Sequence, residues 1–167
     1  VVNIVVEKGV TKIGNGAFAC MPKLKTAQVQ RNLGMAAFWG CANLEKVTYT
    51  NGAGTIGFAC FAECKKLKSV AIPEGISAID KSCFANCKKL KQINLPSTLK
   101  TIGENGFYGC TGLRTVTVKG RVTKCKIFAF YKVKKCKIIL KTKAAKKSKK
   151  VFAKELKQEG NKKVKIK

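Results

Sequence analysis

Apolar positions return along this chain at a fixed interval. A phenylalanine recurs every 23 residues through most of the sequence. The regularly spaced copies are Phe38, Phe61, Phe84, Phe107 and Phe130, and an earlier copy is Phe18. An internal period of this length is typical of a solenoid, in which each unit stacks on the next. We therefore predict a solenoid of about six units that is mainly β, with parallel stacked strands.

Each unit contains two extended pieces. In the clearest copy, Leu67-x-x-Val70-x-Ile72 alternates apolar and polar residues, which predicts a strand with one buried face. Pro73 and Gly75 follow and turn the chain. The piece Ile76-x-x-Ile79 then returns along the other side. Because one unit cannot bury its own apolar face, we expect the core to be a row of equivalent side chains, with the recurring phenylalanines at its centre.

Two stretches carry a resemblance to a known family. Cys87-Lys-Lys-Leu-Lys-Gln-Ile-Asn-Leu-Pro96 and Leu99-Lys-Thr-Ile-Gly-Glu-Asn-Gly-Phe-Tyr-Gly-Cys110 resemble the BspA-like class of leucine-rich repeats almost position by position. The resemblance covers roughly residues 1 to 133. It implies a bacterial cell-surface or secreted protein that takes part in adhesion or interaction, and it implies repeats without catalytic residues.

The start of the chain aligns with the interior of a unit. Val1-x-x-Ile4-x-Val6 matches Leu67-x-x-Val70-x-Ile72, so the chain opens on a strand with no capping segment before it. Residues 1 to 10 also lack the features of an export signal. We expect the sequence to be a fragment, with a solenoid over residues 1–140. The extracellular or cell-surface location comes from the resemblance alone.

The character of the sequence changes toward the C-terminus. Residues 132 to 167 hold 16 lysines and two acids, which is about half of the net charge of +27. Cys136 to Leu140 is expected to form a last strand, residues 144 to 157 a short amphipathic helix, and Val164 to Ile166 a final short strand. We predict that residues 141–167 form an α/β cap. A disordered basic tail is the alternative.

Nine cysteines raise the question of metal binding. The pairs Cys60 and Cys64, and Cys83 and Cys87, have a spacing that suggests ligands. However, all four occupy interior repeat positions, and the chain has no histidine to complete a mixed site. We expect these thiols to be buried, reduced and free of metal, with zinc as the alternative, and we expect no cofactor.

The sequence gives little support for a catalytic function. The absence of histidine removes the commonest general base and its pairs with serine or cysteine. Asp80 is the only aspartate, and the glutamates are scattered over different repeat positions. The sequence predicts that the protein is not an enzyme.

Two surfaces remain as candidates for binding. The outward positions of the main strands are small, polar and nearly uncharged, and they form a candidate binding face of Thr48, Ser69, Gln92, Asn94, Thr115 and Thr117. Beside this face, lysines recur in phase and form a candidate basic edge of Lys65, Lys66, Lys68, Lys88, Lys89, Lys91, Lys134, Lys135 and Lys137. The alternative interpretation is that neither surface binds a partner. The first would then be a solvated strand face, and the second a set of solvated lysines.

The charge narrows the class of partner. A net charge of +27 favours anionic partners such as acidic glycans. Nucleic acid is disfavoured, because 32 of the 35 basic residues are lysine and the aromatics Trp39, Tyr108 and Tyr131 are interrupted by Ala62 and Ala85. No apolar run is long enough to span a membrane, and we expect a monomer.

Our hypothesis is a non-catalytic extracellular adhesion or ligand-binding module for a host or cell-surface protein or a glycan. The alternative is a structural spacer with no ligand of its own.

Overall fold

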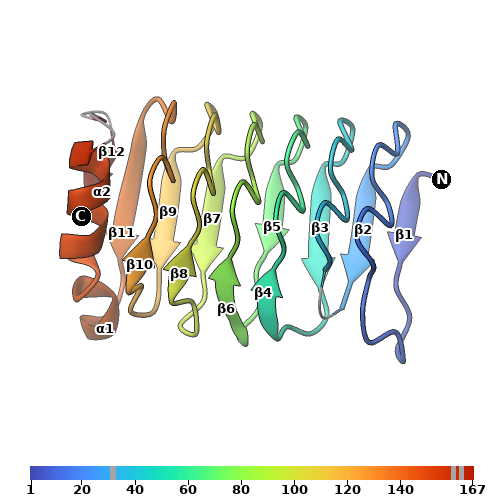
Figure 1. Cartoon of the computed structure of the whole chain (residues 1–167), viewed down its shortest axis with the longest axis horizontal. Helices are drawn as coiled ribbons and strands as arrows, with labels where there is room; N and C mark the ends of the chain where they lie inside the picture. Colours follow the sequence, from blue (N-terminus) through green and yellow to red (C-terminus); the bar gives the residue numbers. More distant parts are fainter. Residues whose placement is uncertain (31–32, 159–160, 162–163) are drawn as a thin grey trace.

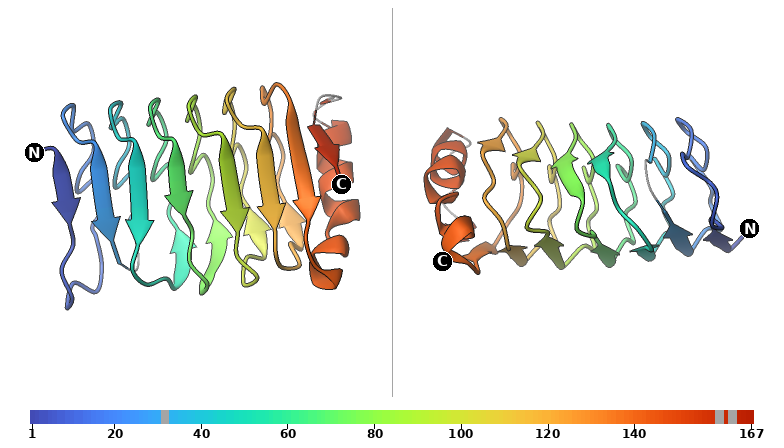
Figure 2. Two further views of the ribbon diagram at one scale, coloured as in Figure 1. Left: turned by 180° about the vertical axis from the view of Figure 1, so that it is seen from behind. Right: turned by 90° about the horizontal axis from the view of Figure 1, so that it is seen from below.

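The chain winds into a row of stacked coils that run along one axis (Figure 1). The computed structural model describes residues 1–30, 33–158, 161 and 164–167. Each coil places one main strand on one side of the solenoid and a short return piece on the other (Figure 2). The predicted solenoid of parallel strands with a period of about 23 residues is confirmed.

The main strands form a continuous side of the molecule in two four-stranded parallel sheets. The first sheet contains β1 (Asn3–Val5), β2 (Thr26–Val29), β3 (Lys46–Tyr49) and β5 (Ser69–Ala71). The second contains β7 (Gln92–Leu95), β9 (Thr115–Val118), β11 (Cys136–Leu140) and β12 (Val164–Ile166). Strands β5 and β7 are neighbours, so the two sheets follow one another along the axis (Figure 2).

The return pieces form a narrower sheet on the opposite side. Its strands are β4 (Gly54–Ile56), β6 (Ile76–Ile79), β8 (Thr101–Ile102) and β10 (Lys124–Cys125), again in parallel. The coils approach each other closely where these strands end. A Cβ at Gly103 would lie 2.6 Å from the carbonyl carbon of Asp80 in the preceding coil. Gly103 has no Cβ and therefore allows its coil to approach the preceding one this closely.

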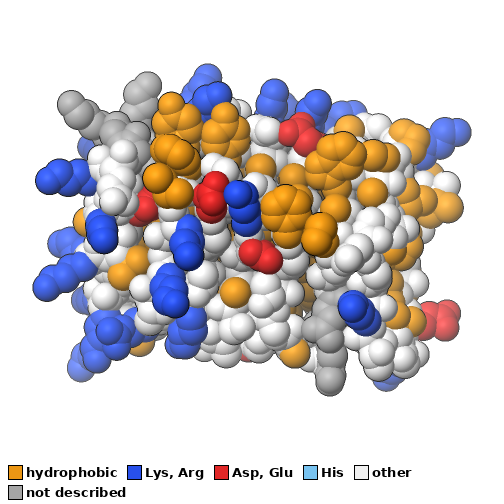
Figure 3. All heavy atoms as spheres, in the orientation of Figure 1, with side chains coloured by type: hydrophobic (Ala, Val, Ile, Leu, Met, Phe, Trp, Pro, Cys, Tyr) orange, Lys and Arg blue, Asp and Glu red, His pale blue; other side chains and the backbone are white. Residues whose placement is uncertain are grey.

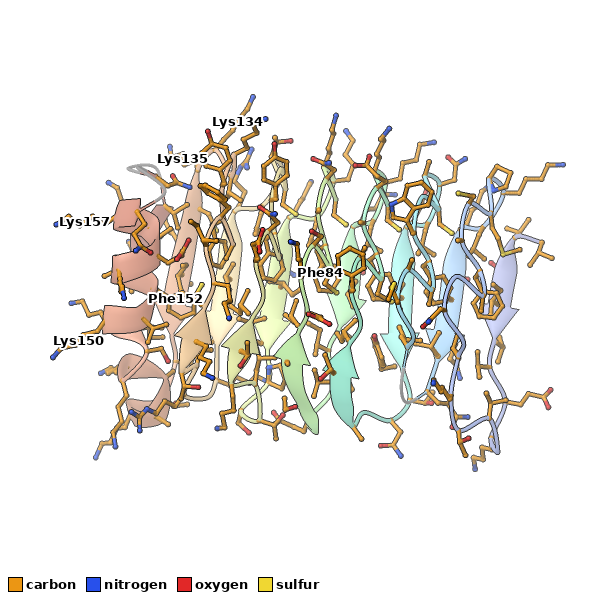
Figure 4. The ribbon with its side chains drawn as sticks, in the orientation of Figure 1. Phe84, Lys134, Lys135, Lys150, Phe152 and Lys157 are labelled. Atoms are coloured by element: carbon orange, nitrogen blue, oxygen red, sulfur yellow. The ribbon has the colours of Figure 1, made fainter. Side chains whose placement is uncertain are left out.

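A column of phenylalanine rings fills the centre of the solenoid. Phe84 is fully buried, and its ring centroid lies 5.4 Å from those of both Phe61 and Phe107. Phe18 differs from the other members because it is only partly buried and its ring is tilted by 30° to that of Phe38. At the opposite end, Phe152 of the C-terminal segment packs against the column, with its ring centroid 6.2 Å from that of Phe130 (Figure 4).

In four units a cysteine follows the phenylalanine by three residues and has a defined role in the stack. Its thiol donates a hydrogen bond to the carbonyl of a phenylalanine in the preceding coil. The Sγ to O distances are 2.9 Å for Cys41, 3.1 Å for Cys64, 3.2 Å for Cys87 and 3.0 Å for Cys110. In these four coils the position holds a small side chain that is apolar in bulk and also offers a weak donor.

The described residues of the C-terminal segment contain two helices where the sequence suggested one. Helix α1 (Lys143–Lys146) begins after Thr142, whose hydroxyl accepts a hydrogen bond from the backbone N–H of Ala145. Helix α2 (Lys149–Gln158) follows after a break at Lys147 and Ser148. The break places the buried hydroxyl of Ser148 2.9 Å from the N–H of Val122, from which it accepts a hydrogen bond. The expected final strand is β12, which pairs with β11.

A side chain of α2 replaces a hydrogen bond that a further coil would supply. In successive coils, the N–H two residues before the phenylalanine donates to a carbonyl of the next coil, as Ser82 does to Glu104 and Asn105 to Ile127. In the last coil the equivalent N–H belongs to Phe128, and it donates to the Glu155 carboxylate at 2.7 Å. Glu155 is only 3% exposed. The carboxylate thus ends the hydrogen-bond ladder of the coils.

Candidate binding surface

The outward side chains of the main strands lie in two rows across the sheets. The pairing of the strands aligns Lys46 with Ser69 in the first sheet, and Gln92 with Thr115 in the second. The other row aligns Thr48 with Ala71, and Asn94 with Thr117. Because side chains alternate along a strand, the residues between them, such as Val47 and Val116, face the core.

The six residues of the candidate binding face therefore lie on one side of the molecule. Ser69, Gln92 and Asn94 are exposed, whereas Thr48, Thr115 and Thr117 are partly exposed. None of them carries a charge. The surface offers hydroxyl and amide groups in parallel rows, and such groups both donate and accept hydrogen bonds.

The lysines of the candidate basic edge lie mainly in the turns that lead into the main strands. These turns are stacked by backbone hydrogen bonds, from the Lys66 N–H to the Ala42 carbonyl and from the Lys89 N–H to the Lys65 carbonyl. Lys134 and Lys135 lie at the same rim, near the C-terminal end of the solenoid (Figure 4). All nine lysine side chains of the edge are exposed. The stack therefore holds cationic groups in a row beside the strand face.

One lysine does not lie where the repeat count places it. The period of 23 residues aligns Lys137 with Lys91, but in the structure Lys137 on β11 pairs with Thr115 on β9. The last coil reaches its strand one residue earlier than the others, so the periodic count fails there. Lys137 belongs to the outward row of the strand face, not to the turns of the edge.

Acidic side chains neutralise only part of the edge. Lys68 lies 2.6 Å from the Glu45 carboxylate, and Lys65 lies 3.7 Å from that of Glu63. The hydrogen bond and charge of Lys68 lower the pKa of Glu45 below its ordinary value. Both pairs are exposed to solvent and stabilise the fold little.

The side opposite the main strands carries exposed aromatic residues. In the sequence, alanines at the equivalent position of other units interrupt this series of aromatics. Tyr131 lies with its ring centroid 5.9 Å from that of Tyr108 and 5.3 Å from that of Phe128. Lys132 extends its ammonium over the Tyr108 ring, 5.1 Å from the centroid. Sequence reasoning missed the contact with Phe128, although a signal existed: this position holds Ala59, Ser82 and Asn105 in other units.

The cysteine pairs that suggested metal ligands lie in the core. Cys60, Cys64, Cys83 and Cys87 are fully buried. Burial raises the pKa of the Cys60 and Cys83 thiols well above the ordinary value of 9.0, which keeps them protonated. Within the described part of the chain, no three cysteine, aspartate or glutamate side chains gather in a way that would hold a metal ion.

Comparison with solved structures supports the architecture. A leucine-rich repeat protein from Bacteroides ovatus matches with a TM-score of 0.77 and 22% identity over 100% of this chain and 42% of its own length. A leucine rich cell surface protein from Faecalibacterium prausnitzii matches with a TM-score of 0.62 and 22% identity over 81% of this chain and 47% of its own length. At these identities the likeness shows the fold.

A third structure matches less closely. The T. pallidum leucine-rich repeat protein gives a TM-score of 0.53 and 20% identity over 83% of this chain and 62% of its own length. The chain thus spans less than two thirds of each of these three structures. A comparison with curated protein sequences found no significant match.

The sequence itself matches a repeat family over almost its whole length. A family profile described as "BspA type Leucine rich repeat region (6 copies)" covers residues 1–35 and 31–158. Members of this family are bacterial surface proteins, and their repeats are typically non-catalytic. None of the described helices combines the length and the apolarity needed to cross a bilayer. The profile, the period and the stacked coils agree, and the chain belongs to the BspA-type leucine-rich repeat family.

Proposed function

We propose that this chain is an extracellular, non-catalytic binding module whose strand face contacts a host or cell-surface protein or a glycan. The observation that carries the proposal is the polar face that contains Thr48, Ser69, Gln92, Asn94, Thr115 and Thr117, next to a row of lysines. Solenoid proteins commonly bind their partners on the extended surface that their stacked repeats create.

The composition of the face supports recognition by hydrogen bonds. Its hydroxyl and amide groups repeat at the spacing of parallel strands, about 4.8 Å. An extended partner laid across the strands would therefore meet equivalent groups in each coil. The lysines beside the face would attract anionic partners from a distance and add little directional specificity.

The proposal is tested by screening the intact chain against a glycan array and a panel of extracellular-matrix proteins. For any partner that binds, we expect a combined Gln92→Ala and Asn94→Ala variant to weaken binding at least about tenfold, the scale of a few lost interface contacts. The matched control is Lys8→Ala with Lys12→Ala, at exposed positions outside the face.

Three outcomes decide the matter. Loss of binding in the face variant with retention in the control supports the proposal. Equal binding by both variants excludes the strand face as the contact surface. If the chain binds none of the glycans or proteins, the spacer role is favoured instead.

A further inference from the structure

A groove runs between the last coil and helix α2, on the side of the molecule away from the main strands. Its volume is about 510 Å³, and its lining includes Lys124, Lys126, Ile127, Val151 and Lys154. We call it the junction groove. Ile127 is 47% exposed, and Val151 is partly exposed, so apolar surface meets solvent between lysine side chains.

Aromatic residues that are exposed or partly exposed lie near this groove. We call Tyr108, Phe128 and Tyr131 the aromatic cluster. Phe128 directly follows Ile127, and its N–H donates to Glu155, which also lines the groove. Phe128 and Tyr131 are each 39% exposed although their rings are in contact with each other. Figure 3 shows hydrophobic side chains gathered on this face near the C-terminal end of the solenoid.

Such a surface differs from scattered surface hydrophobes. Single exposed apolar residues are normal, but contiguous patches with polar rims mark interaction sites. Here Ile127 and Val151 line the same groove, and Phe128, which follows Ile127 in the chain, has its ring in contact with that of Tyr131. Aromatic residues are also enriched among those that contribute most of the free energy at protein interfaces.

The exposed charged side chains in the lining of the groove are all lysines. Lys124, Lys126 and Lys154 are exposed at its rim. The one acid in its lining, Glu155, is buried and holds the N–H of Phe128. The nearby Glu104 lies 3.2 Å from the ammonium of Lys81. The groove therefore presents net positive charge to an incoming partner.

The chemistry of the lining favours a protein segment over a carbohydrate. Specific ligand sites fix orientation with a few well-placed polar groups. The exposed polar groups here are flexible lysines, with Thr123 and Gln158 as the neutral ones. Hydroxyl pairs of a sugar would find few fixed partners. An apolar side chain flanked by carboxylates would fill the groove and meet the lysines.

We propose that the junction groove and the aromatic cluster together form a docking site for an acidic protein segment that carries an aromatic or aliphatic anchor. The anchor lies against Ile127, Val151 and Phe128, while flanking carboxylates meet Lys124, Lys126 and Lys154. This site lies on the other side of the solenoid from the strand face, so its test is independent of the proposed function.

The experiment uses the intact chain and a fluorescein-labelled peptide of glutamates with one central phenylalanine. Anisotropy at physiological salt measures its binding, and a peptide with alanine in place of the phenylalanine tests the anchor. We expect the first peptide to bind and the alanine peptide to bind at least about tenfold more weakly. We expect a similar loss with Tyr131→Ser, Ile127→Ser and Lys126→Glu.

Two variants serve as matched controls. Trp39→Ser changes an exposed aromatic at the same repeat position as Tyr131, and Lys12→Glu makes the same change of charge as Lys126→Glu at the far end of the chain. Both should bind the peptide as the parent does. Denaturant midpoints identify any variant that fails to fold, and backbone NMR shifts of the parent locate the contact without mutation.

The proposal is overturned by any of four results. These are equal binding of both peptides, equal losses in the site and control variants, shifts that map to the strand face, and no binding of the peptide. Heparin and anionic vesicles are run in parallel. If either binds at Ile127 and Tyr131 while the peptide does not, the site serves a polyanion or a lipid surface and the proposal is wrong.

Discussion

The phenol of Tyr49 lies in the core without a hydrogen-bond partner. Its equivalents in other units are Ile72, Leu95 and Val118, so the position is built for an apolar side chain. Tyr49 is 8% exposed. Among the described residues, the Tyr49 hydroxyl is the buried polar group of a side chain that has no hydrogen-bond partner. A buried polar group without a partner lowers the free energy of unfolding.

We therefore expect Tyr49→Phe to stabilise the protein. Removing the unpaired hydroxyl should raise the free energy of unfolding by about 1–2 kcal/mol. Denaturant unfolding measures the change, and Tyr131→Phe at an exposed position is the control, with almost no effect expected. A lower midpoint for Tyr49→Phe would show that the hydroxyl has a partner in solution.

The buried thiols make stability depend on pH in the alkaline range. Burial raises the pKa of Cys83 well above 9.0 in the folded state. Well below pH 9.0 the thiol is protonated in both the folded and the unfolded chain. As the pH rises above that value, the unfolded chain loses the proton first, and stability falls by up to about 1.4 kcal/mol per pH unit for each such thiol.

We expect Cys83→Ala to make this alkaline loss of stability less steep. The measurement is the free energy of unfolding in reductant at several pH values, from about pH 8 to pH 10.5, which spans the ordinary titration of a thiol. Val70→Ala is the control, because it truncates a buried side chain without removing a thiol. It should lower stability by a similar amount at every pH. Parallel pH curves for the parent and Cys83→Ala would contradict the prediction.

At the scale of elements, the link between α2 and the last coil depends on Glu155. Glu155→Ala leaves the Phe128 N–H without its acceptor, so we expect a loss of about 1–3 kcal/mol in the free energy of unfolding. Glu155→Gln retains a carbonyl acceptor and should lose less. The exposed Lys154→Ala on the same helix is the control. Hydrogen exchange at Phe128 should become faster in the alanine variant, and an unchanged rate would contradict this account.

The elements show why some features could be predicted and others could not. The solenoid followed from the recurrence of residues such as Phe84 and Leu90, because stacking gives equivalent positions equivalent environments. The cap does not repeat, so its details had no such guide. The break at Ser148 and the burial of Glu155 depend on contacts with Val122 and Phe128. Contacts of this kind appear only once both segments are placed in space.

The candidate surfaces show the same division. The register that aligns Thr48 with Ala71 follows from the period. The one-residue shift at Lys137 and the contact of Phe128 with Tyr131 arise in the last coil, where the period is broken. Their positions depend on the path of a single irregular turn, which no neighbouring unit repeats.

At the scale of the whole molecule, charge is concentrated toward one end. Removing residues 141–167 would not isolate this charge, because Phe152 and Leu156 of that segment are part of the core. The lysines on the outer side of α2 offer a cleaner test. Lys150 and Lys157 point away from the solenoid (Figure 4). Their replacement changes charge without uncovering apolar surface.

We expect binding of the intact chain to heparin to weaken steeply as salt is added, since the Debye length is only about 8 Å at physiological ionic strength. Combined Lys150→Gln and Lys157→Gln changes should weaken binding more than Lys8→Gln with Lys12→Gln, because the C-terminal segment holds the densest cluster of lysines. Isothermal titration at several salt concentrations measures both effects. Binding that is independent of salt would show that the lysines do not contribute.

The carboxylate at the end of the coil ladder also bears on how long such a molecule can be. In each coil the backbone N–H two residues before the phenylalanine points toward the next coil. Glu155 accepts a hydrogen bond from this N–H in the last coil, and the equivalent N–H of Ser82 or Asn105 could donate the same bond. A C-terminal segment that binds this shared N–H can therefore end a solenoid with any number of units. Duplication or deletion of one unit within a gene would lengthen or shorten the rod by about 4.8 Å and leave its closure intact. Length can then change in evolution one unit at a time, independently of what the surface binds.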